Sequence, residues 1–464
     1  MNGRNVFGLT LLMILLLLAV GSGLAQAPPP TLLPASNSAD IPLASTTPWF
    51  NFEVDTSKDT GQYPSMAVDP SDGYIYISYY DVNMGDLRLA RHGGTAAGVC
   101  GPDYDWDCSV VEGGSGDDFG MYSSIALDPS SDGMGIAYHD ASNGKLKYAY
   151  FPDRNSSAKS VVTIDEGITS VSWTGLYTSL QYASDGSAYI AYQFNNPSGV
   201  DALKLAFPIP AGGNCGIGAA EKRWRCETIM PGEGVGQHAS LAIGPDGQLH
   251  IAYYFGGPGE LWHATSRKLF NGNCGPGMVS WSCYKVAGYP ANVGQYASIF
   301  VDKDNNFHIA YYNATNYTLS YAVSGTSSGN CFYGNADCIE IDDMPVDTRP
   351  HGISIAEDAA GYPIIAYQSA DSLRLARPIA ALGLSETGGN CGPDVPLSSW
   401  YCETIDRAPR YSTARHADYV SIAVGPSGLA AIAYNEYVTA DDGNLAVAWQ
   451  QFQTTFMPLV VRNQ

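Results

Sequence analysis

Apolar and polar residues alternate along most of this chain in a pattern that repeats. The phrase GQHASLAIGPDGQLHIAYYF, which begins at Gly236, returns 58 residues later at Gly294 as GQYASIFVDKDNNFHIAYYN. In each copy a serine opens a short apolar run, a turn rich in Asp, Gly, Pro or Asn follows, and a second apolar run contains a tyrosine near its end. Such alternation between turn residues predicts β-hairpins. The copies are marked by Ser65, Ser124, Ser179, Ser240, Ser298, Ser354 and Ser421.

Two further apolar segments follow the hairpin in the first six copies. The third segment begins at a leucine, as in LKLAF, and the fourth is a short run such as RWRCETI. Units of four short strands, repeated seven times, predict an all-β, seven-bladed β-propeller with four-stranded antiparallel blades. The seventh copy lacks a fourth strand, whereas an unassigned one, PWFNFEVD at 48–55, precedes the first copy. We expect this N-terminal strand to complete the last blade, which removes an exposed sheet edge.

The two ends of the chain differ from the repeats. Residues 1–25 combine one arginine with an apolar core and small residues, which is typical of a secretory signal peptide. Residues 26–47 are rich in Pro, Ser and Thr and predict an extended spacer. The propeller then spans 48–452, and 453–464 form a C-terminal tail. Because no later segment is long and apolar enough for a bilayer span, we expect a secreted or cell-surface protein that does not insert into the membrane after signal removal.

Charge narrows the range of partners. The chain carries 45 acidic against 23 basic residues, which gives a formal net charge of −22. Such a surface repels phosphate backbones, so nucleic acid is excluded as a partner. Only 15% of the residues are charged while 31 are tyrosines, and this balance favours an extracellular all-β protein. Neutral carbohydrate and cell-surface proteins remain as partners.

The ten cysteines form five close pairs, each between a third and a fourth strand. Their even number, their local spacing and the predicted signal peptide favour disulfides in an oxidising compartment. Metal binding is the weaker alternative, because the spacing is wider than the C-x₂-C of zinc sites. The stretch DRNSSAKSVVTI, which begins at Asp153, has no such pair. The predicted disulfides are Cys100–Cys108, Cys215–Cys226, Cys274–Cys283, Cys331–Cys338 and Cys391–Cys402.

A ligand site is expected where the copies differ, on the face at which the first strands begin and the second strands end. We call this face the mouth. Aromatic rings can stack on the CH faces of sugars while amides and carboxylates bind their hydroxyls, so the mouth predicts carbohydrate binding. Packing between blades is the alternative use of the same rings. The candidates on first strands are Tyr63, Tyr122, Tyr177, His238, Tyr296 and Tyr419, and those at the ends of second strands are Tyr80, His139, Tyr254, Tyr312, Asp81 and Asp140.

Motifs for catalysis and for cofactors are missing or weak. The chain has no H-E-x-x-H, G-x-S-x-G, P-loop or dinucleotide fingerprint, and no catalytic residue is assigned. Asp81 and Asp140 could act as the acid and base of a glycan hydrolase. The turn DKDNN, 302–306, has the start of a calcium loop without its distal Glu, so no cofactor is predicted and calcium is left open. Asn155, Asn313 and Asn316 lie in N-x-S/T sequons.

The blade pattern S-h-A-h-D-x-x-G-x-x-h-I-A-Y-Y-D followed by L-K/R-h-A resembles the β-propeller repeats of secreted bacterial proteins called sialidase-like or BNR-like. The resemblance covers roughly 48–452 and implies the fold. Sialidases carry an S-x-D-x-G-x-T-W box that is absent here, and Arg349, Arg410 and Arg415 all enter from the last two blades. Seven-bladed bacterial lectins are similar in architecture, but their repeated Trp is missing, because Trp262 alone lies on a third strand among the first six copies.

The ending FMPLVVRNQ resembles the tails of exported proteins from Chloroflexota-like bacteria, which implies a surface-attachment signal; a loose terminal strand is the alternative. Together these features predict an exported binding module for carbohydrate or a cell-surface protein. An extracellular glycan hydrolase and a structural surface protein remain alternatives.

Overall fold

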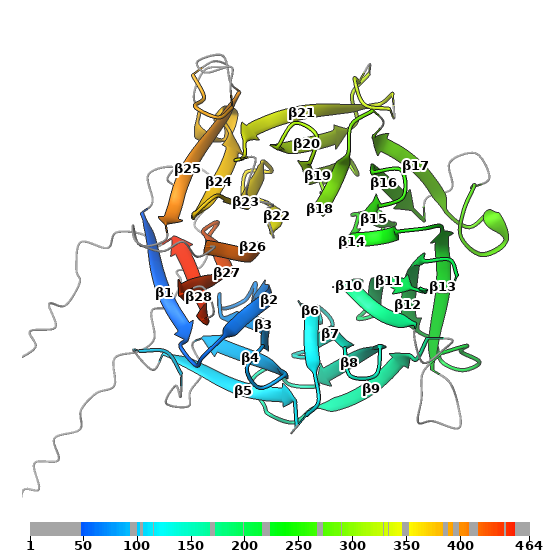
Figure 1. Cartoon of the computed structure of the whole chain (residues 1–464), viewed down its shortest axis with the longest axis vertical. Coiled ribbons are helices and arrows are strands. Elements are labelled where there is room, and N and C mark those ends of the chain that lie inside the picture. The colour runs from blue at the N-terminus through cyan, green and yellow to red at the C-terminus, as the bar shows by residue number, and fades with distance from the viewer. Residues whose placement is uncertain are drawn as a thin grey trace, which may run out of the picture. The chain divides into compact units, whose positions relative to one another are not determined.

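Each repeat of the sequence forms one four-stranded antiparallel sheet in the computed structural model of the chain, and the seven sheets are arranged as the blades of a propeller (Figure 1). The first strand of every blade lies innermost. The structure describes residues 48–92, 100–102, 105–114, 116–167, 172–197, 199–215, 223–266, 272–288, 290–327, 329–332, 334–345, 352–383, 388–392, 399–407, 416–439 and 442–450.

The blades are numbered in the order of the repeats. Blades 1 to 3 consist of β2 (Thr60–Val68), β3 (Ile75–Asp81), β4 (Asp86–His92) and β5 (Trp106–Glu112); β6 (Phe119–Leu127), β7 (Met134–Asp140), β8 (Lys145–Phe151) and β9 (Ser160–Asp165); and β10 (Trp173–Tyr182), β11 (Ala188–Asn195), β12 (Ala202–Pro208) and β13 (Trp224–Pro231). Blades 4 and 5 consist of β14 (Val235–Ile243), β15 (Leu249–Phe255), β16 (Glu260–Thr265) and β17 (Ser282–Ala287); and β18 (Val293–Val301), β19 (Phe307–Asn313), β20 (Thr318–Ser324) and β21 (Ala336–Asp343). Blades 6 and 7 consist of β22 (Ile353–Glu357), β23 (Pro363–Ser369), β24 (Ser372–Pro378) and β25 (Trp400–Arg407); and β26 (His416–Val424), β27 (Ala430–Thr439), β28 (Asp442–Gln450) and β1 (Trp49–Asp55). Two short 3₁₀ turns lie at Pro276–Met278 and Ile379–Leu382.

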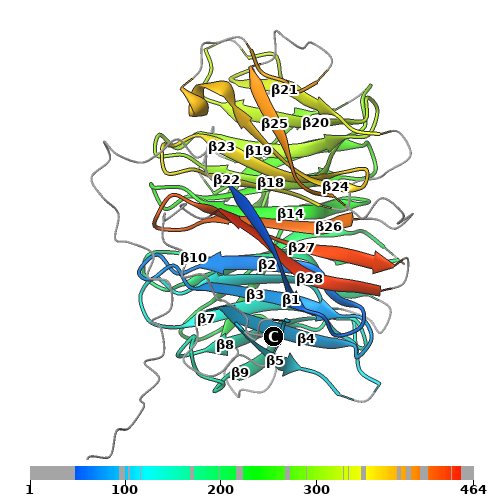
Figure 2. The same ribbon diagram turned by 90° about the vertical axis from the view of Figure 1, so that its left-hand side faces the viewer.

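The seventh blade is completed by the N-terminal strand, which confirms the prediction from the sequence. β1 pairs antiparallel with β28, so that Trp49 faces Gln450 and Phe52 faces Val447. Figure 2 shows β1 in blue beside β28 in red. Segments from the two ends of the described chain therefore share one sheet, and backbone hydrogen bonds hold the ring closed.

The hydrophobic core lies between the blades. Every residue of β3, β7, β19 and β23 is buried, because a second strand packs on both faces against neighbouring blades. Each core cluster joins two adjacent blades; one of them combines Leu203 and Leu205 of blade 3 with Leu241 and Ile251 of blade 4. The apolar alternation in the sequence therefore reports inter-blade packing.

All five predicted disulfides are present, with Cα–Cα distances of 5.2–5.9 Å. Each links the end of the connection after a third strand to the fourth strand of the same blade, and no described cysteine is free. Five disulfides are consistent with an extracellular location. Among the described residues, no helix is long and apolar enough to cross a bilayer. The predicted signal peptide at 1–25, spacer at 26–47 and tail at 453–464 lie outside the described residues.

The repeated phrase Gly-x-aromatic-x-Ser has a structural reason at its glycine. Gly61 has a φ of 88°, and a Cβ added to it would lie 2.6 Å from Leu445 Cα of the preceding blade. A Cβ added to Gly120, Gly175, Gly236 or Gly294 would lie 2.8–2.9 Å from the Cα of the corresponding leucine in the preceding blade. Glycine adopts a positive φ without strain and has no Cβ to prevent so close a backbone approach. In blades 1 to 5 the glycine thus lets the innermost strand pass over its neighbour, while in blade 7 Ala417 takes this position with a φ of 62°.

The serine of the same phrase links every blade to the next. The N–H of Ile125 in blade 2 donates to Ser65 Oγ of blade 1 over 3.1 Å, and the same bond recurs at all seven interfaces. The remaining six join Leu180 to Ser124, Leu241 to Ser179, Ile299 to Ser240, Ile355 to Ser298, Ile422 to Ser354 and Met66 to Ser421. These hydrogen bonds form a closed ring, and they explain why a serine opens each copy.

Candidate functional site

Six aromatic side chains of the first strands form a continuous chain of ring contacts around the innermost strands. We call this set the aromatic collar; it consists of Tyr419, Tyr63, Tyr122, Tyr177, His238 and Tyr296, in that order. Successive ring centroids lie 4.3–4.7 Å apart, and successive rings are tilted by 45–53°. All six side chains are partly exposed. The sixth copy has Gly352 at this position, so one place in the ring has no side chain.

All six collar residues have a positive φ, between 49° and 56°. Non-glycine residues are uncommon in this conformation, and for bulky residues it carries strain. The conformation follows from two register shifts in the strand, one on each side of Gln62 in blade 1 and at the same places in blades 2 to 5 and 7. A strained conformation repeated six times on the face expected to bind a ligand marks the collar as a candidate site.

The tyrosine hydroxyls of the collar are neutral and close to one another. Burial, followed by the neighbouring Tyr122 and Tyr419, raises the pKa of Tyr63 well above its usual value. Burial, followed by Tyr122 and Tyr296, does the same to the pKa of Tyr177. The collar therefore presents uncharged hydroxyls, which can both donate and accept hydrogen bonds, at any physiological pH.

The candidates at the ends of the second strands have a different environment. Tyr80, His139, Tyr254 and Tyr312 are at most 6% exposed. Tyr80 donates to Asp118 over 2.8 Å, His139 Nδ1 donates to the carbonyl of Thr174 over 2.7 Å, and Tyr254 donates to Asn292 over 2.8 Å. Each of these three bonds reaches the beginning of the next blade. Tyr80, His139 and Tyr254 therefore join blades, as the packing alternative expects.

The two carboxylates considered for hydrolysis are also buried. Asp81 and Asp140 are each 2% exposed. Asp81 accepts the Met84 N–H over 3.0 Å and an Arg88 nitrogen over 3.0 Å, and Asp140 accepts the Asn143 N–H over 2.9 Å. Both carboxylates cap the hairpin between the second and third strands of their own blade, and neither is exposed to a substrate.

The turn at Asp302 uses its carboxylate internally. Asp302 accepts the N–H groups of Asp304 and Asn306 over 2.9 and 2.8 Å, and its second oxygen lies 3.2 Å from His308 Nε2. Within the described residues, no group of three or more His, Cys, Asp or Glu side chains is arranged to hold a metal ion. Arg349, Arg410 and Arg415 lie outside the described residues.

A cavity of about 680 Å³ lies on the face opposite the mouth. Its walls are the turns between first and second strands of blades 1 and 2, together with Arg154 and Tyr182. These are the two turns that are one residue longer than in the other copies, and Arg154 belongs to the cysteine-free stretch of blade 2. The two longer turns and the cysteine-free stretch thus meet at one place. All three departures from the repeat are visible in the sequence, but they were not used to predict a site.

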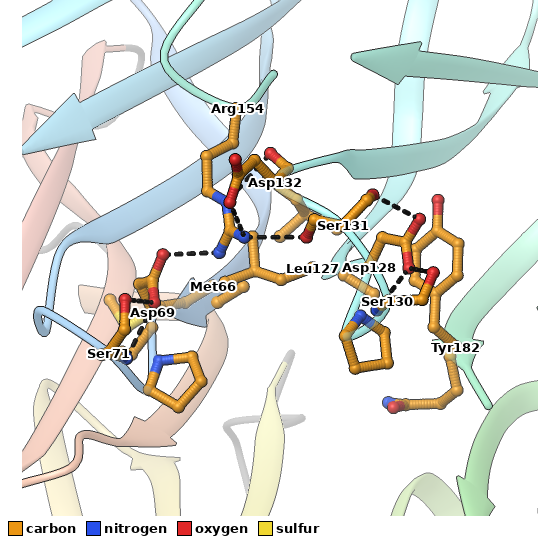
Figure 3. A pocket seen from close by; sticks show the side chains of 17 residues that line it. Met66, Asp69, Ser71, Leu127, Asp128, Ser130, Ser131, Asp132, Arg154 and Tyr182 are labelled. Atoms are coloured by element: carbon orange, nitrogen blue, oxygen red, sulfur yellow. Dashed lines mark hydrogen bonds and ion pairs between the residues drawn. The ribbon is translucent and has the colours of Figure 1, made fainter. Parts of the chain in front are cut away.

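Most polar groups of this cavity bind one another. Arg154 bonds to Asp69 of blade 1 and to the carbonyls of Ser131 and Asp132 in blade 2 (Figure 3). Asp69 and Asp128 also cap their own turns through Ser71 and Ser130. Arg154 therefore links blades 1 and 2 where blade 2 has no disulfide. Of the carboxylates that line the cavity, that of Asp132 is the one left exposed, at 92%.

Comparisons with known proteins find distant likenesses among solved structures alone. No protein-family model matches the chain, and no curated protein matches it. A lectin from Aleuria aurantia is 14% identical, with a TM-score of 0.41, over 76% of this chain and 100% of the lectin. The NanB sialidase from Streptococcus pneumoniae is 12% identical, with a TM-score of 0.41, over 87% of this chain and 70% of the sialidase. The α-L-arabinofuranosidase Arb93A from Fusarium graminearum is 10% identical, with a TM-score of 0.45, over 86% and 97%. Likeness at this level does not bear on function.

Proposed function

We propose that the protein is an exported binding module that recognises neutral carbohydrate at the aromatic collar. The observation that carries this proposal is the collar itself: six partly exposed rings, repeated at one position on the mouth face, with a strained backbone conformation at every one. Neither the packing of hydrophobic residues between blades nor the serine ring requires an aromatic side chain there.

The chemistry of the collar favours a neutral, hydroxyl-rich ligand. Its hydroxyls stay uncharged because burial raises the pKa of Tyr63, Tyr122 and Tyr177. Uncharged phenols that both donate and accept suit sugar hydroxyls, and aromatic edges and faces suit sugar CH groups. An anionic ligand is disfavoured by the formal net charge of −22.

Binding is favoured over catalysis by the position of the carboxylates. A glycan hydrolase needs two carboxyl groups that flank a substrate bond. Asp81 and Asp140 cap hairpins below the surface instead, and the collar contributes hydroxyls and one imidazole. Because both carboxylates cap hairpins, substituting Asp81 or Asp140 would not separate a loss of catalysis from a loss of structure.

The proposal is tested by a glycan-array screen of residues 26–464, with and without calcium. The variants Tyr122→Phe and Tyr296→Phe keep each ring and remove its hydroxyl, and both are expected to weaken binding of a related set of neutral glycans about tenfold. Tyr362→Ala is the matched control, because Tyr362 is 36% exposed in a turn on the opposite face.

Two results would contradict the proposal. An array without signal in both conditions rejects carbohydrate as the ligand. Binding that survives both collar variants but is lost in Asp132→Asn moves the site to the cavity on the opposite face, where Asp132 is the exposed carboxylate.

A further inference from the structure

Trp173 is the one exposed tryptophan of the protein. All eight tryptophans lie in the described residues, and seven of them are buried or partly buried, whereas Trp173 is 52% exposed. It is the first residue of β10 and lies at the mouth, four residues before the collar residue Tyr177. Single exposed apolar residues are common on protein surfaces, so exposure by itself assigns no role.

Comparison with the other blades makes Trp173 informative. The same position in the repeat, two residues before the glycine of the repeated phrase, is Asp118 in blade 2 and Asn292 in blade 5. Asp118 accepts a hydrogen bond from Tyr80 of blade 1, and Asn292 accepts one from Tyr254 of blade 4, so each side chain joins its blade to the preceding one. In blade 3 this inter-blade bond runs instead from His139 to the carbonyl of Thr174. The side chain of Trp173 is thereby released from the structural task that its counterparts perform.

The indole of Trp173 packs partly against blade 2 and is otherwise exposed. Its ring lies 6.1 Å from that of His139, and a Cβ added to Gly144 would approach Trp173 Cδ1 to 3.1 Å. Gly144 therefore makes room for the indole above the hairpin of blade 2. Lys145, the residue that follows Gly144, pairs with the exposed carboxylate of Glu166 over 3.4 Å. An open indole next to charged hydrogen-bonding groups is a surface suited to a sugar ring.

We infer that Trp173 is a stacking platform for a second sugar unit, so that the ligand is an oligosaccharide that extends from the collar over the interface between blades 2 and 3. This inference rests on the proposed function of the collar. Trp173 and Tyr177 lie on one strand, four residues apart, which separates them by at most about 13 Å. A ligand of several sugar units can contact both side chains over a separation of that order.

The test uses residues 26–464 with a panel of neutral hexasaccharides (cellohexaose, xylohexaose, mannohexaose and chitohexaose) and the corresponding monosaccharides. Affinities are measured by calorimetry for the wild type, Trp173→Ala and Trp173→Tyr. Trp173→Ala is expected to lose about tenfold in affinity for the bound hexasaccharide and to keep the monosaccharide affinity unchanged. Trp173→Tyr should recover most of the loss, because it restores an aromatic face.

Fluorescence gives a second readout that a merely structural role would not move. Iodide should quench Trp173 most strongly, since the other seven tryptophans are buried or only partly exposed, and the bound hexasaccharide should protect it. The inference is overturned, while the proposed function stands, if wild type and Trp173→Ala bind a hexasaccharide equally well and the hexasaccharide does not change the iodide quenching of the wild type. If no member of the panel binds, the proposed function falls and the inference falls with it.

Discussion

The interfaces between blades fall into two kinds, and the difference lies in what meets a buried tyrosine of the second strand. In five blades the hydroxyl of this tyrosine donates to a carboxylate at the end of the fourth strand of the preceding blade. Tyr192, for example, donates to Asp165 over 2.7 Å. The other four pairs are Tyr79 with Asp55, Tyr138 with Glu112, Tyr367 with Asp342 and Tyr434 with Asp406.

A cation of the third strand completes four of these contacts. Lys204 pairs with Asp165, and the corresponding pairs are Arg88 with Asp55, Lys147 with Glu112 and Arg374 with Asp342. The carboxylate thus binds a phenol and a cation at once, with both partners largely removed from solvent. Charge-assisted hydrogen bonds of this kind are stronger than neutral ones.

The tyrosines of blades 4 and 5 meet no such carboxylate, because the fourth strands of blades 3 and 4 lack one. The residues in register with Asp165 are Met230 and Ala287, which pair with the corresponding leucines Leu203 and Leu261. Tyr253 of blade 4 is fully buried, and its hydroxyl has no hydrogen-bond partner among the described residues. Tyr311 of blade 5 bonds to Ser320 of its own blade instead.

The difference shows that packing and the serine bonds are common to all interfaces, while the carboxylate contacts are optional additions. A buried ion pair and well-packed apolar residues of similar size can contribute about equally to stability. Removing one member of a pair is a different matter, because it leaves a buried charge without compensation.

Breaking one carboxylate contact is expected to have the largest effect. Asp165→Asn keeps the shape of the side chain and leaves the largely buried ammonium of Lys204 unpaired, so we expect a loss of about 3 kcal/mol in the free energy of unfolding. Urea denaturation measures it. Met230→Ala at the same register in blade 3 is the control, and a loss from Asp165→Asn no larger than that of the control would contradict the role given to the carboxylate.

Removing the tyrosine hydroxyl should have opposite signs in the two kinds of interface. Tyr192→Phe deprives Asp165 of a donor and should lower the free energy of unfolding by about 1.5 kcal/mol. Tyr253→Phe removes a buried hydroxyl without a partner and should leave it unchanged or raise it by about 1 kcal/mol. The two variants are compared by their urea midpoints. Equal losses from both would mean that Tyr253 has a partner in solution.

Most of the fold follows from the sequence, because it depends on features that alternate with a period of two. Local sequence patterns set the strands, the seven repeats, the disulfides and the N-terminal strand around Phe52 that completes the last blade. The function of the serines was not predicted, since the Ser65 bond joins residues 60 apart in the chain. The sequence did not separate the exposed candidate residues from the buried ones. In the sequence, Tyr63 and Tyr80 are both tyrosines of predicted strands. Only the register shift before Ser65 leaves Tyr63 partly exposed, whereas Tyr80 is buried.

Lowering the pH should destabilise blade 4 most, because its His263 is fully buried, while burial also lowers the pKa of His308 in blade 5. Burial, and next the charge of His250, lowers the pKa of His263 well below its usual value. The unfolded chain then binds a proton that the folded state does not, so stability is constant above about pH 6.5 and falls by up to about 1.4 kcal/mol per pH unit below it. Tyr284 and Phe307 pack against the same imidazole.

Asp165 also loses its contribution on acidification, but only at a lower pH. Burial raises the pKa of Asp165, but Lys204 and the hydrogen bonds lower it by more, so the net pKa is below the usual value. The contribution of Asp165 to stability is therefore complete above about pH 3.9 and is lost only below it.

Hydrogen exchange at pH 7 and pH 5, corrected for intrinsic rates, should show loss of protection in blade 4 between these values. His263→Gln should reduce that loss, and an identical loss in the variant would rule out His263 as its source.

The serine ring should have the smallest effect and should sharpen the contrast. Ser124→Ala, at an interface that keeps the Asp165 contact, leaves the Leu180 N–H without its acceptor and should reduce the free energy of unfolding by about 1 kcal/mol. Ser240→Ala removes the same bond at the interface between blades 4 and 5, where no carboxylate contact supports it. Local hydrogen exchange should therefore rise more in β18 of the second variant than in β10 of the first, because fewer contacts remain to hold the innermost strands together. Equal increases would mean that each interface is held by packing alone and that the carboxylates add nothing to local cohesion.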